Sequence, residues 1–488
     1  MRRPRTPRCC TASWARWRCT RWRHSALRRP RRALRRSRRP TSWRASTPWS
    51  PSRSATRMKT PTATSLKTMT HTPKDITGRG ELIQLIVDLG ALATNTRFFA
   101  DFVAPAQFMA VVKAEGYNHG ALRIAQTALD HGAAVLGVAT VPEALLLRDE
   151  APVKDDEPAT IFAWMWEPAM DLTPAFEAEL TLGVPSLAHA RSLIDQARSW
   201  QGEACPVVGV MADTGMSRSG ISPAEWQETI ALLAAAEKEG LIAVDGVFTH
   251  LASADEDAQR AVTDRQHQRF QQAIADCRAA GMAVPRNHIA NTPATLTRPD
   301  MHHELVRPGL GVYGVDPVAG GTPTGAAENA VPGLPDVLPL QRTMSMRAKV
   351  ITTRVVPKDE SVSYGGTWTA PEDTRTAVVA AGYADGVPRS ASGKMQVSIN
   401  GESYQQIGRI CMDQFVVALG PAESAAAEAV QPGDWAVIFG DPDKGEPGLE
   451  DLAAAADTIP YEVVTMPRGP RVQWVVVDVE GEEHVVER

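Results

Sequence analysis

Short apolar runs alternate with amphipathic stretches along the chain from Leu82 onward. Six runs have the length of buried strands, namely Phe108–Val112, Ala134–Val138, Thr160–Met165, Thr181–Val184, Val207–Met211 and Val244–Phe248. The stretches between them have helical spacing, and such alternation predicts parallel strands with both sheet faces covered. Its extent, about 230 residues, suits an α/β fold closed as a (β/α)8 TIM barrel. An open doubly wound sheet is the alternative.

Two capping sequences predict where helices begin. Thr140-Val-Pro-Glu143 has the capping-box spacing with a proline in the first turn. Ser222-Pro-Ala-Glu225 repeats the pattern before a predicted helix over Trp226–Glu239.

The pattern changes after Gly314. Residues 315–337 are rich in Pro, Gly and Ala and predict a linker or surface loop. The runs beyond it alternate with period two and predict an antiparallel sheet with one short helix, Glu450–Asp457. The expected strands are Met346–Val356, Thr376–Ala380, Gln396–Ile399, Val416–Leu419, Trp435–Phe439 and Val472–Val479. We therefore expect a barrel domain over 82–325 and a mostly β C-terminal domain over 338–488.

Charge separates the first residues from the rest. Residues 1–74 hold 22 Lys and Arg and no acidic side chain, whereas residues 75–488 carry a formal net charge near −26. We interpret 1–81 as a disordered or misannotated extension, with Met58 or Met69 as the start; a targeting segment or a nucleic-acid-binding arm are the alternatives. The acidic remainder predicts that neither nucleic acid nor a membrane surface is a partner.

Cysteine spacing predicts the redox compartment, and hydropathy predicts whether a helix spans a membrane. Cys205, Cys277 and Cys411 lie far apart without paired spacing, which argues against disulfides or zinc and favours a reducing cytoplasm. No uninterrupted apolar run approaches 18 residues, so no membrane-spanning helix is expected. We expect no metal.

A lysine follows the first predicted strand, in Val111-Val-Lys-Ala-Glu-Gly-Tyr-Asn-His-Gly120. A barrel would place Lys113 on its catalytic face, where desolvation lowers the pKa of an amine and favours Schiff-base chemistry. The alternative is a solvated lysine at a strand end.

Further clusters each have a structural alternative. Arg218, in Asp213-Thr-Gly-Met-Ser-Arg218, is suited to a carboxylate or to an exposed turn. His250 would either lie flat against an aromatic ring or be a buried histidine with satisfied hydrogen bonds. Thr292, with the amides of Gly309 and Leu310, is suited to a phosphate.

The second region adds Val362-Ser-Tyr-Gly-Gly366, Gly382-Tyr-Ala-Asp-Gly386 and Gly408-Arg-Ile-Cys-Met-Asp413. Each is weak alone, but the whole ordered set resembles the alanine racemase family from about Ile86 to Arg471. That family is pyridoxal-phosphate-dependent. The resemblance implies interconversion of L- and D-alanine in the cytoplasm, supplying D-alanine for peptidoglycan.

The resemblance also implies roles for individual residues. Lys113 would carry pyridoxal 5'-phosphate and act as one base at the substrate Cα, and Tyr364, from the second subunit of a homodimer, would act on the opposite face. Removing a proton from one face and returning it at the other needs two such groups. The matching cofactor contacts are Lys113, Tyr117, His250, Thr292, Arg307, Gly309, Leu310 and Tyr461. The matching substrate contacts are Arg218, Met412 and Tyr383, the last at the entrance.

Arg307 would face the pyridine nitrogen, with His288 as its neighbour. Because arginine gives up a proton reluctantly, it would not readily protonate the pyridine nitrogen. The ring would then withdraw electrons less strongly, which would suppress transamination and decarboxylation. Alternatives are a broader-specificity or serine racemase, another barrel enzyme such as an amino-acid decarboxylase, and a non-catalytic cofactor carrier. The chain departs from the family at Met211, where many members carry a carbamylated lysine beside the substrate-binding arginine. A chloride ion or another carboxylate would have to replace that charge.

Overall fold

The computed structural model describes residues 81–150, 152–154, 157–318, 321–322, 331 and 333–486. The interpretation of 1–81 as an extension therefore concerns residues that, apart from Glu81, lie outside the described part. Within the described residues, no helix combines the length and the apolar character that crossing a bilayer requires.

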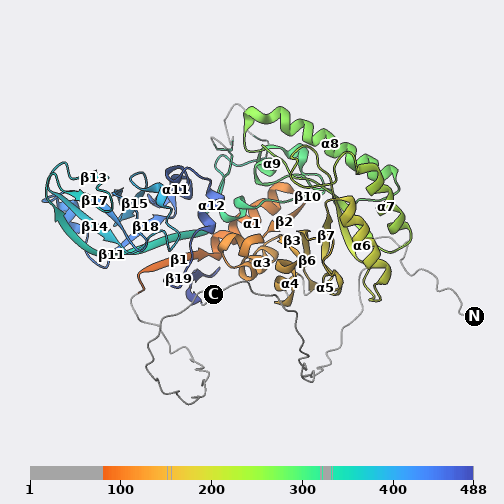
Figure 1. The fold of residues 1–488 in the computed structure, drawn as a ribbon, viewed down its shortest axis with the longest axis horizontal. Coiled ribbons are helices and arrows are strands. Elements are labelled where there is room, and N and C mark those ends of the chain that lie inside the picture. Colours follow the sequence, from red (N-terminus) through yellow and green to blue (C-terminus); the bar gives the residue numbers. More distant parts are fainter. Residues whose placement is uncertain are drawn as a thin grey trace, which may run out of the picture. The chain divides into compact units, whose positions relative to one another are not determined.

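A parallel sheet forms the first region, and its helices lie around it (Figure 1). Its spatial order is β10-β2-β3-β6-β7-β8-β9. The strands are β2 (Gln107–Val111), β3 (Val135–Thr140), β6 (Thr160–Met165), β7 (Thr181–Val184), β8 (Val207–Met211), β9 (Ala243–Phe248) and β10 (Leu305–Val306). The helices are α1 (Leu89–Val103), α2 (Lys113–Asn118), α3 (Ala121–Asp130), α4 (Val141–Asp149), α5 (Thr173–Glu177), α6 (Leu187–Ser199), α7 (Trp226–Lys238), α8 (Arg260–Ala279) and α9 (Thr292–Thr297).

The eighth strand position is reduced to a bridge at His288. The His288 amide donates to Val247 of β9 (3.0 Å), and the Arg307 amide, directly after β10, donates to Ala290 (2.8 Å). Because β10 also pairs with β2, the ring of backbone hydrogen bonds closes. The predicted barrel is confirmed, and the open sheet is excluded.

Large side chains fill the barrel interior where neighbouring strands carry glycine. A Cβ on Gly183 would lie 2.9 Å from the Phe248 ring, and one on Gly209 would lie 2.9 Å from the Phe162 ring. Phe162 and Phe248 meet edge to face with centroids 5.0 Å apart. These packed side chains in the barrel interior support the residues at the carboxyl ends of the strands.

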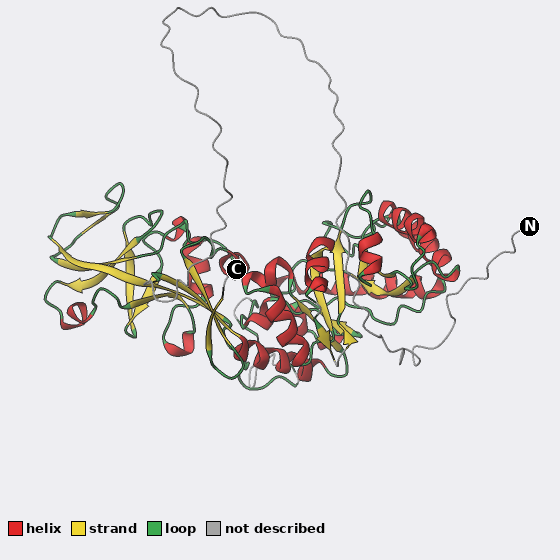
Figure 2. Ribbon diagram, turned by 90° about the horizontal axis from the view of Figure 1, so that it is seen from below, coloured by secondary structure: helices red, strands yellow, loops and turns green. Residues whose placement is uncertain are grey.

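The second region is a nine-stranded, largely antiparallel sheet with few helices, confirming the mostly β prediction (Figure 2). Its strands are β1 (Ile83–Asp88), β11 (Met344–Val356), β14 (Thr374–Val379), β15 (Gln396–Ile399), β16 (Glu402–Ile407), β17 (Phe415–Pro421), β18 (Trp435–Phe439), β19 (Val472–Val477) and β20 (Glu483–Val486). This region also contains a short hairpin of β12 (Ser361–Val362) and β13 (Trp368–Thr369), whereas a second short pair, β4 (Val153–Lys154) with β5 (Glu157–Pro158), lies in the barrel region between α4 and β6. The helices of the second region are α10 (Ala425–Ala429), α11 (Leu449–Ala456) and α12 (Pro460–Thr465).

Some local expectations differ from the structure. The Thr140 capping box forms at α4, but Ser222 caps nothing: α7 begins at Trp226 with Glu225 as an N-cap that makes no side-chain hydrogen bond. The single helix expected in the second region is one of three. Strand β1, within the range expected for the barrel domain, pairs instead with β11 and β19 of the second sheet.

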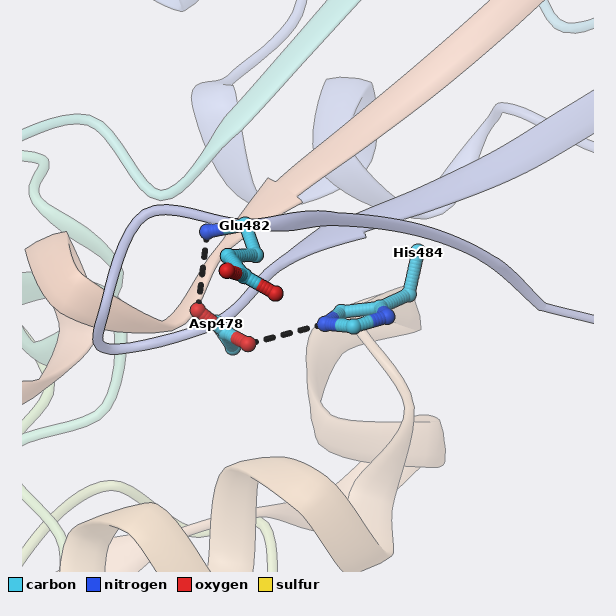
Figure 3. A group of neighbouring side chains, drawn as sticks. All are labelled: Asp478, Glu482 and His484. Carbon is cyan, nitrogen blue, oxygen red and sulfur yellow. Dashed lines mark hydrogen bonds and ion pairs between the residues drawn. The ribbon is translucent and has the colours of Figure 1, made fainter.

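An exposed side-chain cluster shapes the turn between β19 and β20 (Figure 3). The Asp478 carboxylate accepts from the amides of Glu480 (3.0 Å) and Glu482 (2.9 Å) and bonds the His484 ring (2.8 Å). The His484 bond and these amides lower the pKa of Asp478. Because the turn itself uses both carboxylate oxygens, we assign the cluster a structural role.

Candidate active site

Lys113 lies at the carboxyl end of β2, as predicted, and is the first residue of α2. Its Nζ is 5.7 Å from the centre of the Trp164 ring on β6 and 5.9 Å from that of Tyr117. Burial, together with the nearby charges of Arg218 and Arg307, lowers the pKa of Lys113, and Glu143 opposes this shift. A lysine with a lowered pKa is easier to deprotonate, as a nucleophile or base requires.

The backbone after Lys113 is left-handed. Ala114, Glu115, Gly116 and Tyr117 have φ of 52°, 58°, 60° and 51°, so α2 is a left-handed turn. For an L-residue this conformation costs roughly 1–2 kcal/mol, and only Gly116 escapes the penalty. Strain of this kind persists where surrounding contacts hold it, most often at functional sites.

Contacts from three directions hold this turn. The Gly116 amide donates to Val112 (2.9 Å). The Asn118 side chain donates to two main-chain carbonyls at and just beyond the end of α12 (3.2 and 3.0 Å). The Ala114 amide donates to the Glu143 carboxylate of α4 (2.8 Å). The turn is therefore fixed by both regions of the chain, and the sequence carried no signal for it beyond one glycine.

A group of hydrogen-bond donors surrounds Gly309, at the start of the 3-10 helix η4 (Leu310–Tyr313). The Thr292 hydroxyl oxygen accepts from the amides of Gly309 (2.9 Å) and Gly311 (3.3 Å). A Cβ on Gly309 would lie only 2.5 Å from the Tyr117 hydroxyl, so glycine is required for this approach. The structure thus brings together Tyr117, Thr292 and Gly309, which the sequence analysis grouped.

The donor group around Thr292 and Gly309, which we call the cradle, includes two phenols that stay protonated, those of Tyr117 and Tyr461. The Tyr117 ring packs 4.7 Å from that of Tyr313 and 6.2 Å from that of Tyr461 on α12. Burial raises the pKa of Tyr117 far above its ordinary value and that of Tyr461 to about 12. Neutral phenols donate hydrogen bonds, and together with the Thr292 hydroxyl they suit an anion such as a phosphate.

Arg307 lies buried beside two neutral histidines. Its guanidinium donates to the Thr249 carbonyl (2.6 Å) and the His288 carbonyl (2.7 Å), and contacts His288 Nδ1 (2.8 Å) and His250 Nδ1 (3.5 Å). Burial and the charge of Arg307 lower the pKa of His250 to about 3 and that of His288 well below its ordinary value. Burial lowers the pKa of Arg307 itself to about 10, so it stays charged at neutral pH.

Arg218 is exposed on the loop after β8, and Met211, the last residue of β8, is buried in the barrel interior. The Ser219 hydroxyl lies 3.7 Å from the Met211 sulfur. In the described part of the chain no carboxylate forms an ion pair with Arg218. The carboxylate considered as a substitute for the carbamate is therefore not found there.

The three weak motifs of the second region meet in one place. The Ser363 hydroxyl donates to the Arg409 carbonyl (2.7 Å), and the amides of Tyr383 and Ala384 donate to the carbonyls of Cys411 and Met412 (both 3.1 Å). A Cβ on Gly382 would lie 2.3 Å from the Met412 oxygen, so this approach also requires glycine.

The ion pairs of Arg471 hold the second and third of these motifs together. Arg471 contacts Asp385 and Asp413, each at 2.8 Å, and Asp385 also accepts from the Gly382 amide (2.9 Å). Three other side chains of these motifs are exposed to solvent: Tyr364 by 72%, Met412 by 53% and Tyr383 by 37%. Among the described residues Tyr364 has no hydrogen-bond partner. Its hydroxyl is therefore available at the surface of the chain.

Sequence reasoning missed two neighbours of Lys113. Trp164 lies in a predicted strand, but nothing in the run Thr160–Met165 indicates which side chain faces the lysine. Glu143 was recognised as a helix cap, whereas its bond to Ala114 joins residues 29 positions apart.

Comparisons with known proteins identify the family. The chain matches the family models for the alanine racemase N-terminal domain over residues 87–317 and the C-terminal domain over 343–476. It is 42% identical to an alanine racemase of Mycobacterium ulcerans over 401 residues (82% of this chain, 96% of that protein), and 42% identical to one of Corynebacterium glutamicum (81% and 99%).

Solved structures give the same answer. The crystal structure of alanine racemase from D-cycloserine-producing Streptomyces lavendulae has a TM-score of 0.72 and 38% identity, covering 82% of this chain and 97% of that one. Alanine racemase from Bartonella henselae with covalently bound pyridoxal phosphate has a TM-score of 0.69 and 26% identity, covering 81% and 99%. The predicted family is confirmed: the chain belongs to the alanine racemase family.

Proposed function

We propose that the chain interconverts L-alanine and D-alanine with Lys113 and Tyr364 as the two bases. The observation that carries the proposal is the lysine itself, held by a strained turn at the carboxyl end of the barrel with a lowered pKa. The opposite face of the substrate carbon needs a second proton-transfer group. Tyr364, exposed and tethered through Ser363 to the Arg409 loop, suits that role.

The residues at the barrel end fit pyridoxal 5'-phosphate. Its phosphate suits the cradle of Tyr117, Thr292, Gly309, Leu310 and Tyr461, where a Cβ on Gly309 would fill the available space. Lys113 would hold it covalently, while Arg307 and His250 would lie beside its ring. When bound, the cofactor supplies an electron sink for the carbanion left at Cα. Arg307, charged and hydrogen-bonded to carbonyls, would keep that sink weak.

Arg218 would bind the substrate carboxylate through its planar guanidinium, assisted by the backbone at Met412. Tyr383, bonded through its amide to the Cys411 carbonyl, would line the entrance. Because these second-region residues are exposed, a second copy of the chain would bring its own Tyr364 to the Lys113 site. We therefore infer a homodimer with shared active sites, formed by the domains 82–325 and 338–488.

The product would serve peptidoglycan synthesis in the cytoplasm. A reducing compartment suits the thiols of Cys277 and Cys411, both of which are free.

Chiral chromatography after incubation of the full chain with pyridoxal phosphate and L-alanine tests the proposal. We expect equal amounts of both enantiomers at equilibrium; carbon dioxide release would indicate a decarboxylase, and faster turnover of serine a serine racemase. Lys113→Ala should abolish the visible absorbance of the bound cofactor. Tyr364→Phe should keep that absorbance and lose most turnover. Normal racemisation by Tyr364→Phe contradicts the two-base assignment.

Light scattering tests the dimer, and a matched mixture tests sharing. Lys113→Ala and Tyr364→Phe variants, each inactive alone, should regain activity when mixed, because one site in each mixed dimer is then intact. Absence of recovery in verified mixed dimers contradicts sharing.

A further inference from the structure

A single carboxylate links the N-terminus of α4 to the backbone that follows Lys113. One oxygen of Glu143 accepts from the Thr140 amide (2.8 Å) and hydroxyl (3.0 Å), which closes the capping box of α4. Its other oxygen accepts from the Ala114 amide (2.8 Å). Capping would be complete without the second contact, so the Ala114 bond calls for its own explanation.

The hydrogen bond to the Ala114 amide lies where the backbone changes from negative to positive φ. Val112 has a φ of −116°, whereas Ala114 is the first of the consecutive residues with positive φ. Alanine pays the full steric penalty there because it has a Cβ. A rigid acceptor on α4 therefore stabilises a conformation that the local sequence disfavours. Because Lys113 is the preceding residue, displacement of Ala114 would displace the lysine as well.

The same carboxylate alters the charge around the lysine amine. Arg218, after β8, and Arg307, after β10, both disfavour the protonated amine, whereas Glu143 favours it. The remaining neighbours, His250 and Tyr117, are neutral at pH 7, since their pKa values are lowered and raised respectively. Glu143 thus opposes two cations without being part of the cofactor cradle.

We propose that Glu143 is a positioning residue for Lys113, holding the left-handed turn through Ala114 and balancing the positive charge of Arg218 and Arg307. This inference rests on the proposed function, since it deepens the role given there to Lys113. Glu143 itself would touch neither substrate nor cofactor, and it would act only through the lysine.

Glu143→Gln separates the two roles of the side chain. Glutamine also serves in capping boxes, so its oxygen can still accept from Thr140. Its NH2 group would then face the Ala114 amide, donor against donor, and the negative charge is lost. In the full chain loaded with cofactor we expect kcat/KM to fall on the order of tenfold to a hundredfold, the scale of a small misplacement of a catalytic group.

Two further readouts distinguish positioning from general damage. Hydrogen exchange of the peptide containing 113–118 should become faster in Glu143→Gln, with or without cofactor, while the peptides of α4 stay protected. Losing a negative charge lowers the pKa of a nearby ammonium. The acid limb of the kcat profile, which reports groups in the enzyme–substrate complex where the Lys113 amine would act as a base, should therefore move to lower pH.

Thr140→Ala is the matched control. It removes the side-chain cap of α4 and the hydroxyl bond to Glu143, but the Glu143 charge and its bonds to the amides of Thr140 and Ala114 remain. It should therefore lower the melting temperature but shift neither the pH profile nor exchange at 113–118. The proposal is overturned if Glu143→Gln leaves both readouts unchanged, or if Thr140→Ala changes them equally. A wild-type chain without racemase activity would instead overturn the proposed function, and exchange at 113–118 would still report on the Ala114 contact.

Discussion

Replacing Thr292 by valine removes one oxygen from the centre of the phosphate cradle. Thr292 is buried, and its hydroxyl oxygen accepts from the amides of Gly309 (2.9 Å) and Gly311 (3.3 Å). Each buried donor left without a partner costs about 1–3 kcal/mol. Since the Gly311 bond is the longer, we expect Thr292→Val to destabilise the chain by about 2–4 kcal/mol.

Thr292→Ser is the control that keeps the oxygen. It loses only the γ-methyl group, which lies where a Cβ on Gly311 would approach it to 2.6 Å. Burial of one such group contributes about 0.8 kcal/mol. The serine variant should therefore retain most of the stability and the donor geometry of the cradle, whereas valine should lose both.

Thermal unfolding of the cofactor-free chain, followed by circular dichroism, measures the difference. At about 2–4 °C per kcal/mol for a large domain, valine should lower Tm by about 4–16 °C and serine by only about 2–3 °C. Cofactor titration should give at least about tenfold weaker binding for valine alone, the equivalent of about 1.4 kcal/mol. Equal melting of the two variants would refute the assignment of both amides to this hydroxyl.

Three other outcomes follow from the structure. Met211 has no amine to form a carbamate, so racemisation should proceed equally in degassed and bicarbonate-supplemented buffer; a faster rate with bicarbonate contradicts this. Gly246→Ala should prevent soluble folding, costing about 4 kcal/mol or more, because its Cβ would lie 1.8 Å from the Arg286 carbonyl oxygen; a well-folded variant would disprove the close approach. His250, with a pKa lowered to about 3 by burial and Arg307, stays neutral in the folded chain and takes up a proton only on unfolding, where the pKa is about 6.5. Stability present above pH 6.5 should therefore fall as the pH drops towards 3, and His250→Asn should flatten the dependence of Tm on pH.

The barrel was predictable because its strands are local features of the sequence. A strand buried on both faces appears as a continuous apolar run, and the runs at Thr160–Met165, Thr181–Val184 and Val207–Met211 coincide with β6, β7 and β8. The strand Ile83–Asp88 was not among the predicted strands: it is buried only at alternate residues, and it pairs with β11 and β19, hundreds of residues away. Its place in the fold depends on those distant partners, which a local pattern does not identify.

The site was predictable as a set of residues but not as a geometry. Motif order indicated Lys113, Thr292 and Arg307, and the structure brings their surroundings to one end of the barrel. The left-handed turn had no signature, because Ala114 and Tyr117 favour the right-handed region and tertiary contacts override that preference. For the same reason, a helix cap such as Glu143 gave no indication of its second bond.

The distribution of charge explains how an acidic chain can favour an anionic cofactor. Residues 75–488 carry a formal charge near −26, so long-range attraction of anions is not available. At the barrel end, however, Arg307 is buried and charged, and Arg218 has no carboxylate ion pair within the described residues. The neutral donors of the cradle, including Tyr117, add no charge. Binding must therefore depend on short-range contacts in a desolvated pocket, which salt screens only weakly.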